Sequence, residues 1–210
     1  LLAESPALRR GLDALAAVPR SPRGAVVWLA FLSMALCWVH WGLGLIGSAF
    51  LARRIALRQP KVHYPLLVAV AYWGMGASWH GGLSGSAPLL MATPKHFMES
   101  TVGLIPLSQT TFSPLNLALV AVSFLLAVAL AWALYPPEAH ARTADPEALK
   151  SFKDLPQLRL SEARTLSAII ERSWACNGAL GLLGLGWLAL DYSANGFTLT
   201  EGVLIIRGII

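Results

Sequence analysis

Charge is scarce in this 210-residue sequence, and long hydrophobic runs take its place. Only 13% of the residues are charged and 56% are hydrophobic, whereas a soluble domain carries about 25% charged residues. The apolar residues do not recur with the period of 2 or 3.6 that half-buried strands and helices of soluble proteins show. This composition excludes an ordinary soluble domain and predicts an all-α polytopic membrane protein.

Cysteines and buried acids are also rare. Cys37 and Cys176 lie in apolar runs without a CxxC partner, so we expect packing residues rather than a disulfide or metal ligands. Glu99 and Asp191 come closest to the apolar runs, yet neither lies inside one. No histidine pair has helical metal-ligand spacing, and no nucleophile and base have a defined geometry. The sequence therefore predicts no metal site, no catalytic residues and no enzymatic activity.

The net charge of +5 does not indicate nucleic-acid binding. Arg53, Arg54, Arg58 and Lys61 cluster directly after an apolar run, as the positive-inside rule predicts for a cytoplasmic loop. Nucleic-acid-binding surfaces instead have a basic stripe interleaved with aromatic residues, and none is found. The expected surroundings are a lipid bilayer that the chain crosses several times.

The apolar runs predict the transmembrane segments. Residues 24–52 contain no charge and exceed the roughly 20 residues that a span needs, so the excess implies tilt or a break. Residues 63–79 are either a short transmembrane helix or a half-span. Further spans are predicted at 114–135 and 173–190, and residues 203–210 begin another that the sequence cuts short.

The remaining segments are more polar. Residues 1–23 are predicted to be either an interfacial amphipathic helix or a connecting loop. Residues 136–164 form a hydrophilic loop whose basic residues favour the cytoplasm. The chain begins without Met and stops inside an apolar run, so we expect an internal portion of a longer protein, organised as one incomplete membrane domain.

A glycine-rich stretch, HGGLSGSAPLLMATPKH at residues 80–96, interrupts the apolar sequence. Each of its glycines weakens a helix by about 1 kcal/mol, and its prolines remove backbone donors. Broken backbone at membrane depth survives only inside protein or along a polar cavity. We therefore predict a re-entrant hairpin over residues 80–113 that lines a site; the alternative is a loop at the membrane surface.

Several strings of this sequence resemble the short-chain fatty acid transporter family. They are KVHYPLLVAVAYWGMGASWHGGLSGSAPLL (61–90), WGLGLIGSAFL (41–51) and IPLSQTTFSPLN (105–116). The resemblance implies a multi-pass secondary carrier of the bacterial inner membrane that moves small monocarboxylates such as acetoacetate or butyrate across this cytoplasmic membrane. One departure is Lys95, where the family pattern leads us to expect a glycine that would tighten a turn.

A carboxylate substrate would need hydrogen-bond donors to replace water. Peptide N–H groups at broken helices and nearby hydroxyls supply them without a fixed countercharge. The predicted substrate-binding residues are His80, Gly81, Gly82, Ser84, Gly85, Ser86 and Thr93. The predicted coupling residues are His80, Ser108, Thr110 and Thr111, with either Na⁺ or H⁺ as the coupling ion and no bound cofactor.

A different class of function stays open on the sequence alone. The same glycines could serve only helix packing, in a membrane scaffold or a channel-like subunit that does not transport. Saturable, competitive uptake of butyrate would separate the two hypotheses. The sequence leaves open whether the protein forms a homo-oligomer.

Overall fold

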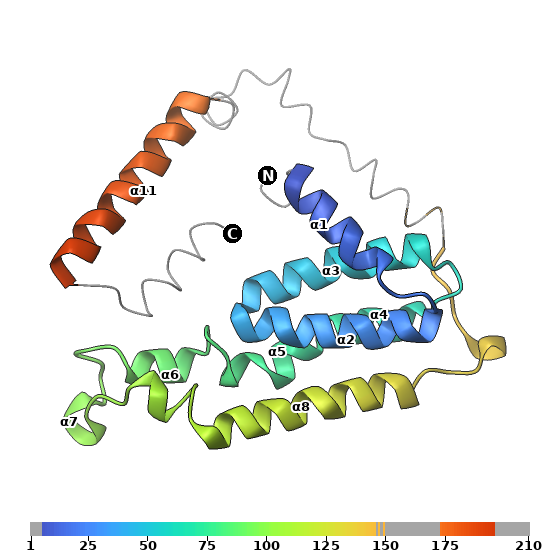
Figure 1. Cartoon of the computed structure of the whole chain (residues 1–210), viewed down its shortest axis with the longest axis horizontal. Coiled ribbons are helices and arrows are strands. Elements are labelled where there is room, and N and C mark those ends of the chain that lie inside the picture. The colour runs from blue at the N-terminus through green and yellow to red at the C-terminus, as the bar shows by residue number, and fades with distance from the viewer. Residues whose placement is uncertain (1–5, 146, 148, 150–172, 196–210) are drawn as a thin grey trace. The chain divides into compact units, whose positions relative to one another are not determined.

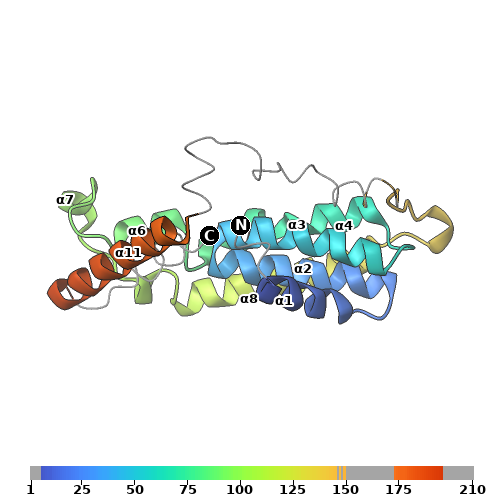
Figure 2. The same cartoon turned by 90° about the horizontal axis from the view of Figure 1, so that it is seen from above.

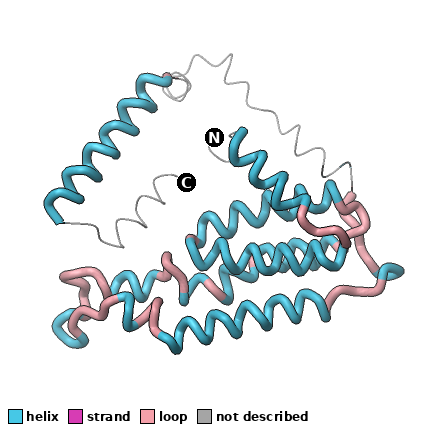
Figure 3. The backbone as a smooth tube through the Cα atoms, in the orientation of Figure 1, coloured by secondary structure: helices cyan, strands magenta, loops and turns pink. Residues whose placement is uncertain are grey.

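The structure, a computed structural model, describes residues 6–145, 147, 149 and 173–195. All regular elements in these ranges are helices and none is a strand (Figures 1 and 3), which confirms the all-α expectation. The described residues fall into two compact units, one formed by residues 6–145, 147 and 149 and the other by residues 173–195. The predictions for residues 150–164 and 203–210 lie outside the described residues.

The second unit contributes one long helix, α11 (Trp174–Asn195). It contains the predicted span 173–190. Its leucines are largely exposed, with Leu182 at 71% and Leu190 at 72%. That exposure suits a hydrocarbon environment better than water, but the placement of α11 in a membrane stays a prediction.

The apolar run predicted as a span over residues 24–52 forms two helices in the first unit. Helix α2 (Pro22–Val39) and helix α3 (Trp41–Arg58) run antiparallel (Figure 1), because His40 adopts an extended backbone between them. A Cβ on Gly44 would lie 2.1 Å from Cys37 Sγ. The pair is therefore a tight helical hairpin whose tip is His40. Of the two predictions made from the excess length of residues 24–52, tilt or a break, the structure shows a break.

The predicted segment 63–79 and the start of the glycine-rich stretch form an interrupted rod. Four short helices follow one another end to end, the first three beside α2 and the last beyond its end (Figure 1). They are α4 (Tyr64–Ala71), α5 (Trp73–Ala77), the 3₁₀ turn η2 (Trp79–Gly81) and α6 (Ser86–Met91).

Small residues and hydroxyls hold the rod against α2. Ser33 Oγ donates to Val70 O at 2.7 Å, and Ser78 Oγ donates to Met34 O at 2.7 Å. Between these bonds Gly74 lets the two backbones touch, since a Cβ there would lie 2.1 Å from Ser33 O. Close backbone approach with hydroxyl bridges is typical of helix packing in membranes.

The rest of the predicted hairpin 80–113 extends beyond the tip of the α2–α3 hairpin (Figures 1 and 2). It contains α7 (Glu99–Val102) and the 3₁₀ turn η3 (Leu107–Gln109). Large apolar side chains on it are exposed, with Phe97 at 78% and Leu104 at 50%. The segment connects the rod to the next long helix, and its placement in a membrane is untested.

Helix α8 (Pro114–Ala133) lies inside the predicted span 114–135. Ser113 caps its first turn by accepting from Asn116 N at 3.2 Å, and Pro114 suits the first helical position. Its outer face is hydrocarbon: Leu115 is 72% exposed and Leu125 is 71% exposed. Among the described helices, α2 and α8 are long and apolar enough to cross a bilayer.

Basic residues collect at the end of the first unit opposite the hairpin tip. We call this the basic end; it comprises residues 20–23, 58–64 and 135–143. Hydrogen bonds join its loops, from Arg142 N to His63 Nδ1 at 2.9 Å and from Tyr64 N to Arg142 O at 2.8 Å. Helix α1 (Pro6–Ala17) packs on α3 with Leu12 and Ala16 buried.

Lys95 has φ of +62°, the left-handed region that favours glycine. This conformation agrees with the turn that a glycine would tighten. Lys95 N donates to the Glu99 carboxylate, which helps to hold the turn. His96 holds the following loop: its Nδ1 accepts from Met98 N at 3.2 Å, and its Nε2 lies 3.1 Å from Gly103 O.

Replacing Lys95 by glycine is expected to stabilise the fold by up to about 1 kcal/mol. A left-handed L-residue costs roughly 1–2 kcal/mol, and the freedom that glycine gains in the unfolded chain offsets about half of the relief. Thermal unfolding in detergent measures the change. Lys95→Ala is the control, because it removes the charge and keeps the Cβ; an equal gain in both variants would contradict the prediction.

Candidate functional site

Three interruptions of helix meet at one place in the first unit, which we call the junction. It comprises the hairpin tip (residues 38–41), the break in the rod (79–85) and the chain that leads into α8 (110–116). The tip and the break are bonded directly: Leu83 N donates to Trp38 O at 2.7 Å, and Trp41 N donates to Ser84 Oγ at 3.0 Å.

His40 itself caps α3. It is 3% exposed, and its Nδ1 accepts from Gly42 N at 3.2 Å and from Leu43 N at 3.4 Å. Two of the first N–H groups of α3 are thereby satisfied by an imidazole, which takes the place of the usual Ser, Thr, Asp or Asn cap. The histidine therefore fixes the turn of the hairpin at the junction.

The glycines of the break allow backbones to touch. A Cβ on Gly82 would lie 2.2 Å from Trp38 O, and a Cβ on Gly85 would lie 2.6 Å from His80 O. Their amides are used inside the protein, since Gly82 N donates to Trp79 O and Gly85 N to Gly82 O. Both glycines thus shape the junction, while their N–H groups already have acceptors.

Asn116 joins the start of α8 to the break. Its Nδ2 donates to Gly81 O at 2.9 Å and to Thr111 O at 2.8 Å. One amide group thus holds two carbonyls from segments 30 residues apart in the sequence. The predicted residues Gly81 and Thr111 are brought together in this way.

The other predicted residues lie at different distances from this contact. Ser84 is fully buried, whereas Ser86 and Ser108 are exposed. His80 is exposed and meets Trp79 edge-to-face at 4.5 Å between ring centroids. Thr93 Oγ1 donates to Leu89 O at 2.7 Å, one turn back along α6. Gly81, Gly82, Ser84, Gly85 and Thr111 therefore belong to the junction core. His80 lies at its exposed edge, and Ser86 follows the junction as the first residue of α6.

Several buried polar atoms at the junction have no hydrogen-bond partner within the described part of the chain. They are Trp38 Nε1, Thr110 Oγ1 and Thr111 Oγ1, and Thr111 is 1% exposed. Each buried group left in this state costs about 1–3 kcal/mol. The junction therefore offers one N–H donor and two hydroxyls to a ligand, an ion or water.

The chemistry available is that of neutral hydrogen bonding. No group of three or more His, Cys, Asp or Glu side chains that could hold a metal ion occurs among the residues that the structure describes. The hydroxyls and the indole N–H can donate hydrogen bonds to a small anion. The hydroxyls and the constrained carbonyls can coordinate a hard cation. Bond-breaking chemistry would need an activated nucleophile, and the junction presents none among its described side chains.

Comparison with known proteins decides the family. The family model described as "Short chain fatty acid transporter" matches residues 1–210. The chain belongs to this short-chain fatty acid transporter family. No solved structure matches it.

Two curated relatives support the assignment. A protein of Escherichia coli K12 is 34% identical over 208 residues, which are 95% of this chain and 45% of that protein. A protein of Haemophilus influenzae is 31% identical over an alignment of 220 positions, which covers 100% of this chain and 49% of that protein. Both carry the name "Putative short-chain fatty acid transporter". The chain spans about half the length of the relatives it matches.

Family membership confirms part of the sequence-based interpretation. The resemblance is confirmed, and the family is one of transporters and not of enzymes. Together with the apolar helices α2 and α8, it indicates a membrane protein. The site residues, the coupling ion and the carrier mechanism stay proposals.

Sequence reasoning missed Trp38, His40 and Asn116 as junction residues. Asn116 did carry a signal, because it is a lone amide one turn into a charge-free helix. His40 also carried a signal, because it is the one histidine in the apolar run 24–52. Trp38 carried no signal, since its role depends on the glycine break packing against the hairpin tip.

Proposed function

We propose that the junction binds a short-chain monocarboxylate within the membrane and that the protein carries it across the bilayer as a secondary transporter. The observation that carries this proposal is the convergence of three helix interruptions at a point well inside the expected hydrocarbon layer. Secondary transporters place substrate and ion sites near the midplane, at the ends of broken helices.

The depth of the junction follows from helix geometry. Arg53 and Arg54 are the first charged residues of α3, and Arg54 pairs with Asp13. Twelve residues separate Arg53 from Trp41 at the tip, which is about 18 Å of helix. The hydrocarbon core is about 30 Å thick. With its charges at one surface, the α2–α3 hairpin ends inside the core, so it is a re-entrant hairpin.

Helix α8 also places the junction inside the hydrocarbon core, at a somewhat greater depth. Trp132 lies at the level of Arg23, at the basic end. Asn116, at the junction, is sixteen residues away along α8, which is about 24 Å of helix. The basic end then lies at one membrane surface, and the positive-inside rule assigns that surface to the cytoplasm. Because α2 and α3 form a hairpin, the basic residues before α2 and after α3 share this side.

A carboxylate at the junction would exchange water for fixed donors. Trp38 Nε1 and Thr111 Oγ1 are buried without partners within the described residues, His80 is exposed, and Ser86 is exposed directly after the break. The acyl chain would lie against apolar side chains, at about 0.8 kcal/mol per buried CH₂. The Thr110 and Thr111 hydroxyls are ligands that Na⁺ accepts, whereas His80 could carry H⁺.

The test is uptake of radiolabelled butyrate by cells that express the protein from its natural gene. We expect saturable uptake that acetoacetate inhibits competitively and that collapses with either the Na⁺ or the H⁺ gradient. Uptake that rises linearly with butyrate would instead indicate a channel. No uptake above control cells, with protein present in the membrane, would favour a scaffold.

The Ser86→Ala variant is expected to raise the KM for butyrate about tenfold. A hydrogen bond to a charged group contributes about 1.5–3 kcal/mol, and Ser86 is exposed, so the fold does not depend on its hydroxyl. Ser100→Ala, an exposed serine in α7, is the matched control. Unchanged KM in Ser86→Ala would remove this residue from the site.

A further inference from the structure

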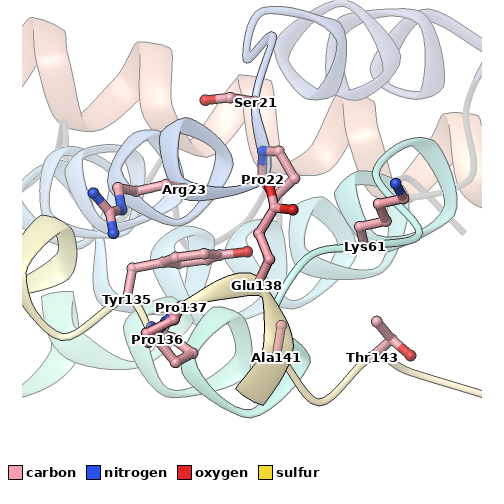
Figure 4. Close-up of a pocket in the computed structure, with 10 residues that line it drawn as sticks. All are labelled: Ser21, Pro22, Arg23, Lys61, Tyr135, Pro136, Pro137, Glu138, Ala141 and Thr143. Atoms are coloured by element: carbon pink, nitrogen blue, oxygen red, sulfur yellow. The ribbon is translucent and has the colours of Figure 1, made fainter.

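A cavity lies at the basic end of the first unit, and no junction residue lines it (Figure 4). Its volume is about 400 Å³. Its walls come from the start of α2, the loop before α4 and the loop after α8. The lining residues are Ser21, Pro22, Arg23, Lys61, Tyr135, Pro136, Pro137, Glu138, Ala141 and Thr143.

The cavity is positively charged overall. Arg23 and Lys61 contribute two cations and Glu138 one carboxylate. Figure 4 shows Arg23 and Lys61 at opposite sides of the view, with Glu138 between them. Within the described part of the chain, no ion pair involves these three side chains. The excess of one positive charge is therefore not neutralised by the residues around it.

The walls are fixed by bonds between the loops. His63 N donates to Tyr135 Oη at 3.3 Å, and Arg142 N donates to His63 Nδ1 at 2.9 Å. The cavity thus does not depend on exposed side chains alone for its shape. Arg23 and Lys61 could each meet a negatively charged ligand, with the Ser21 and Thr143 side chains as further polar lining.

An apolar strip runs directly into the cavity. Leu125 and Trp132 of α8, seven residues apart and so on one face of the helix, are 71% and 60% exposed, and Tyr135 lines the cavity. The Arg23 guanidinium lies 5.1 Å from the centroid of the Trp132 ring and 5.6 Å from that of Tyr135. Tryptophan, tyrosine and arginine in this arrangement mark the headgroup level of a bilayer.

We infer that this cavity binds the phosphodiester of an anionic phospholipid headgroup, with the acyl chains along the exposed strip of α8. A phosphodiester carries one negative charge, which matches the excess charge of the cavity. A soluble phosphate would match the charge but make no use of the apolar strip. The inference rests on the membrane placement proposed above and not on the transport activity.

The test uses the protein expressed from its natural gene, purified in detergent and unfolded by heat. Dioleoylphosphatidylglycerol is expected to raise the unfolding midpoint by about 3 °C or more, because ligands that bind the folded state stabilise it. Dioleoylphosphatidylcholine should do so much less. Equal effects of the two lipids would overturn the inference, since acyl chains alone would then account for the stabilisation.

Variants locate the effect. Lys61→Gln is expected to lose at least two thirds of the phosphatidylglycerol shift, whereas Arg58→Gln, an exposed control on the last turn of α3, keeps it. Arg23→Gln should lose the shift. It should also lower the midpoint without lipid, because the contacts of the guanidinium with the Trp132 and Tyr135 rings are removed. Glu138→Gln should enlarge the shift by removing the repelling carboxylate. A full shift in Lys61→Gln would overturn the assignment.

Soluble anions show whether the cavity binds a lipid headgroup or a free phosphate-containing anion. Glycerophosphoglycerol and inorganic phosphate, which have no acyl chains, should give less than a third of the lipid's shift. If either gives the full shift, the cavity is a site for free anions and the lipid assignment is wrong. The readout does not involve uptake, so a failure of the transport proposal would leave this result interpretable.

Discussion

Gly74→Ala is expected to destabilise the protein by about 3–5 kcal/mol, whereas Gly76→Ala, two residues along the same short helix, should change stability by less than about 1 kcal/mol. A Cβ at position 74 would lie 2.1 Å from Ser33 O and 2.6 Å from Ser33 C. These are backbone atoms of α2, so they cannot rotate away. A Cβ at position 76 would meet nothing within 4 Å.

The size of the loss follows from what must move. Helix α5 would have to separate from α2, and the bonds from Ser33 to Val70 O and from Ser78 to Met34 O span the same interface. Overpacking costs about 1–3 kcal/mol, and each broken bond adds about 1 kcal/mol. Total stability is only about 5–15 kcal/mol, so a large part of the Gly74→Ala protein should be unfolded or aggregated.

Thermal unfolding and size-exclusion chromatography in detergent compare the two variants. We expect Gly74→Ala to give a low yield of monodisperse protein and a strongly lowered midpoint. Gly76→Ala should match the unmodified protein or exceed it slightly, because alanine has less freedom to lose on folding. Equal midpoints for the two alanine variants would mean that α5 does not touch α2 at Gly74.

Local signals made some elements predictable. Helix α8 is bounded by Ser113 and Pro114 at its start and by Pro136 and Pro137 after its end. Capping and proline chemistry act over a few residues, so they can be recognised without knowing the fold. The break after Trp79 was predictable for the same reason, because three glycines in five residues oppose any helix.

The hairpin at His40 could not be placed from local signals. Neither proline nor a common capping residue interrupts residues 24–52 at that point, and the turn depends on an imidazole that bonds Gly42 N and Leu43 N. Only the excess length of the run indicated a break. The turn is secured by Leu83 and Ser84, more than 40 residues later, which bond to Trp38 O and Trp41 N.

The break in the glycine-rich stretch was predictable, but the hydrogen bonds that its residues make were not. The glycine-rich stretch was identified as broken backbone, and it lies at the junction. The N–H groups of Gly82 and Gly85, which were expected to be free for a carboxylate, donate to Trp79 O and Gly82 O respectively. Whether an amide is free depends on where a distant carbonyl comes to lie. The unpartnered Trp38 Nε1 and Thr111 Oγ1 are likewise products of tertiary packing.

Single cysteines should report the sidedness of the fold as an all-or-none difference. In a background with Cys37 and Cys176 replaced by alanine, we expect a membrane-impermeant maleimide to label Arg20→Cys and Thr143→Cys from one face only. Both positions are exposed at the basic end. Thr101→Cys, exposed in α7, should be labelled only from the opposite face. Labelling of positions 20 and 143 from opposite faces would contradict the hairpin arrangement.

The decisive position is the hairpin tip. Trp41 is 36% exposed, so a cysteine there could react if water reached it. A tip about 18 Å from Arg53, inside a core of about 30 Å, has no contact with bulk water on the far side. Trp41→Cys should therefore react at least about tenfold more slowly than Thr101→Cys, and butyrate should slow it further if the junction holds substrate. Fast labelling of position 41 from the face that labels position 101 would show that α2 and α3 are two complete crossings. The junction would then lie at the membrane surface. A carboxylate there keeps its water and needs no fixed donors.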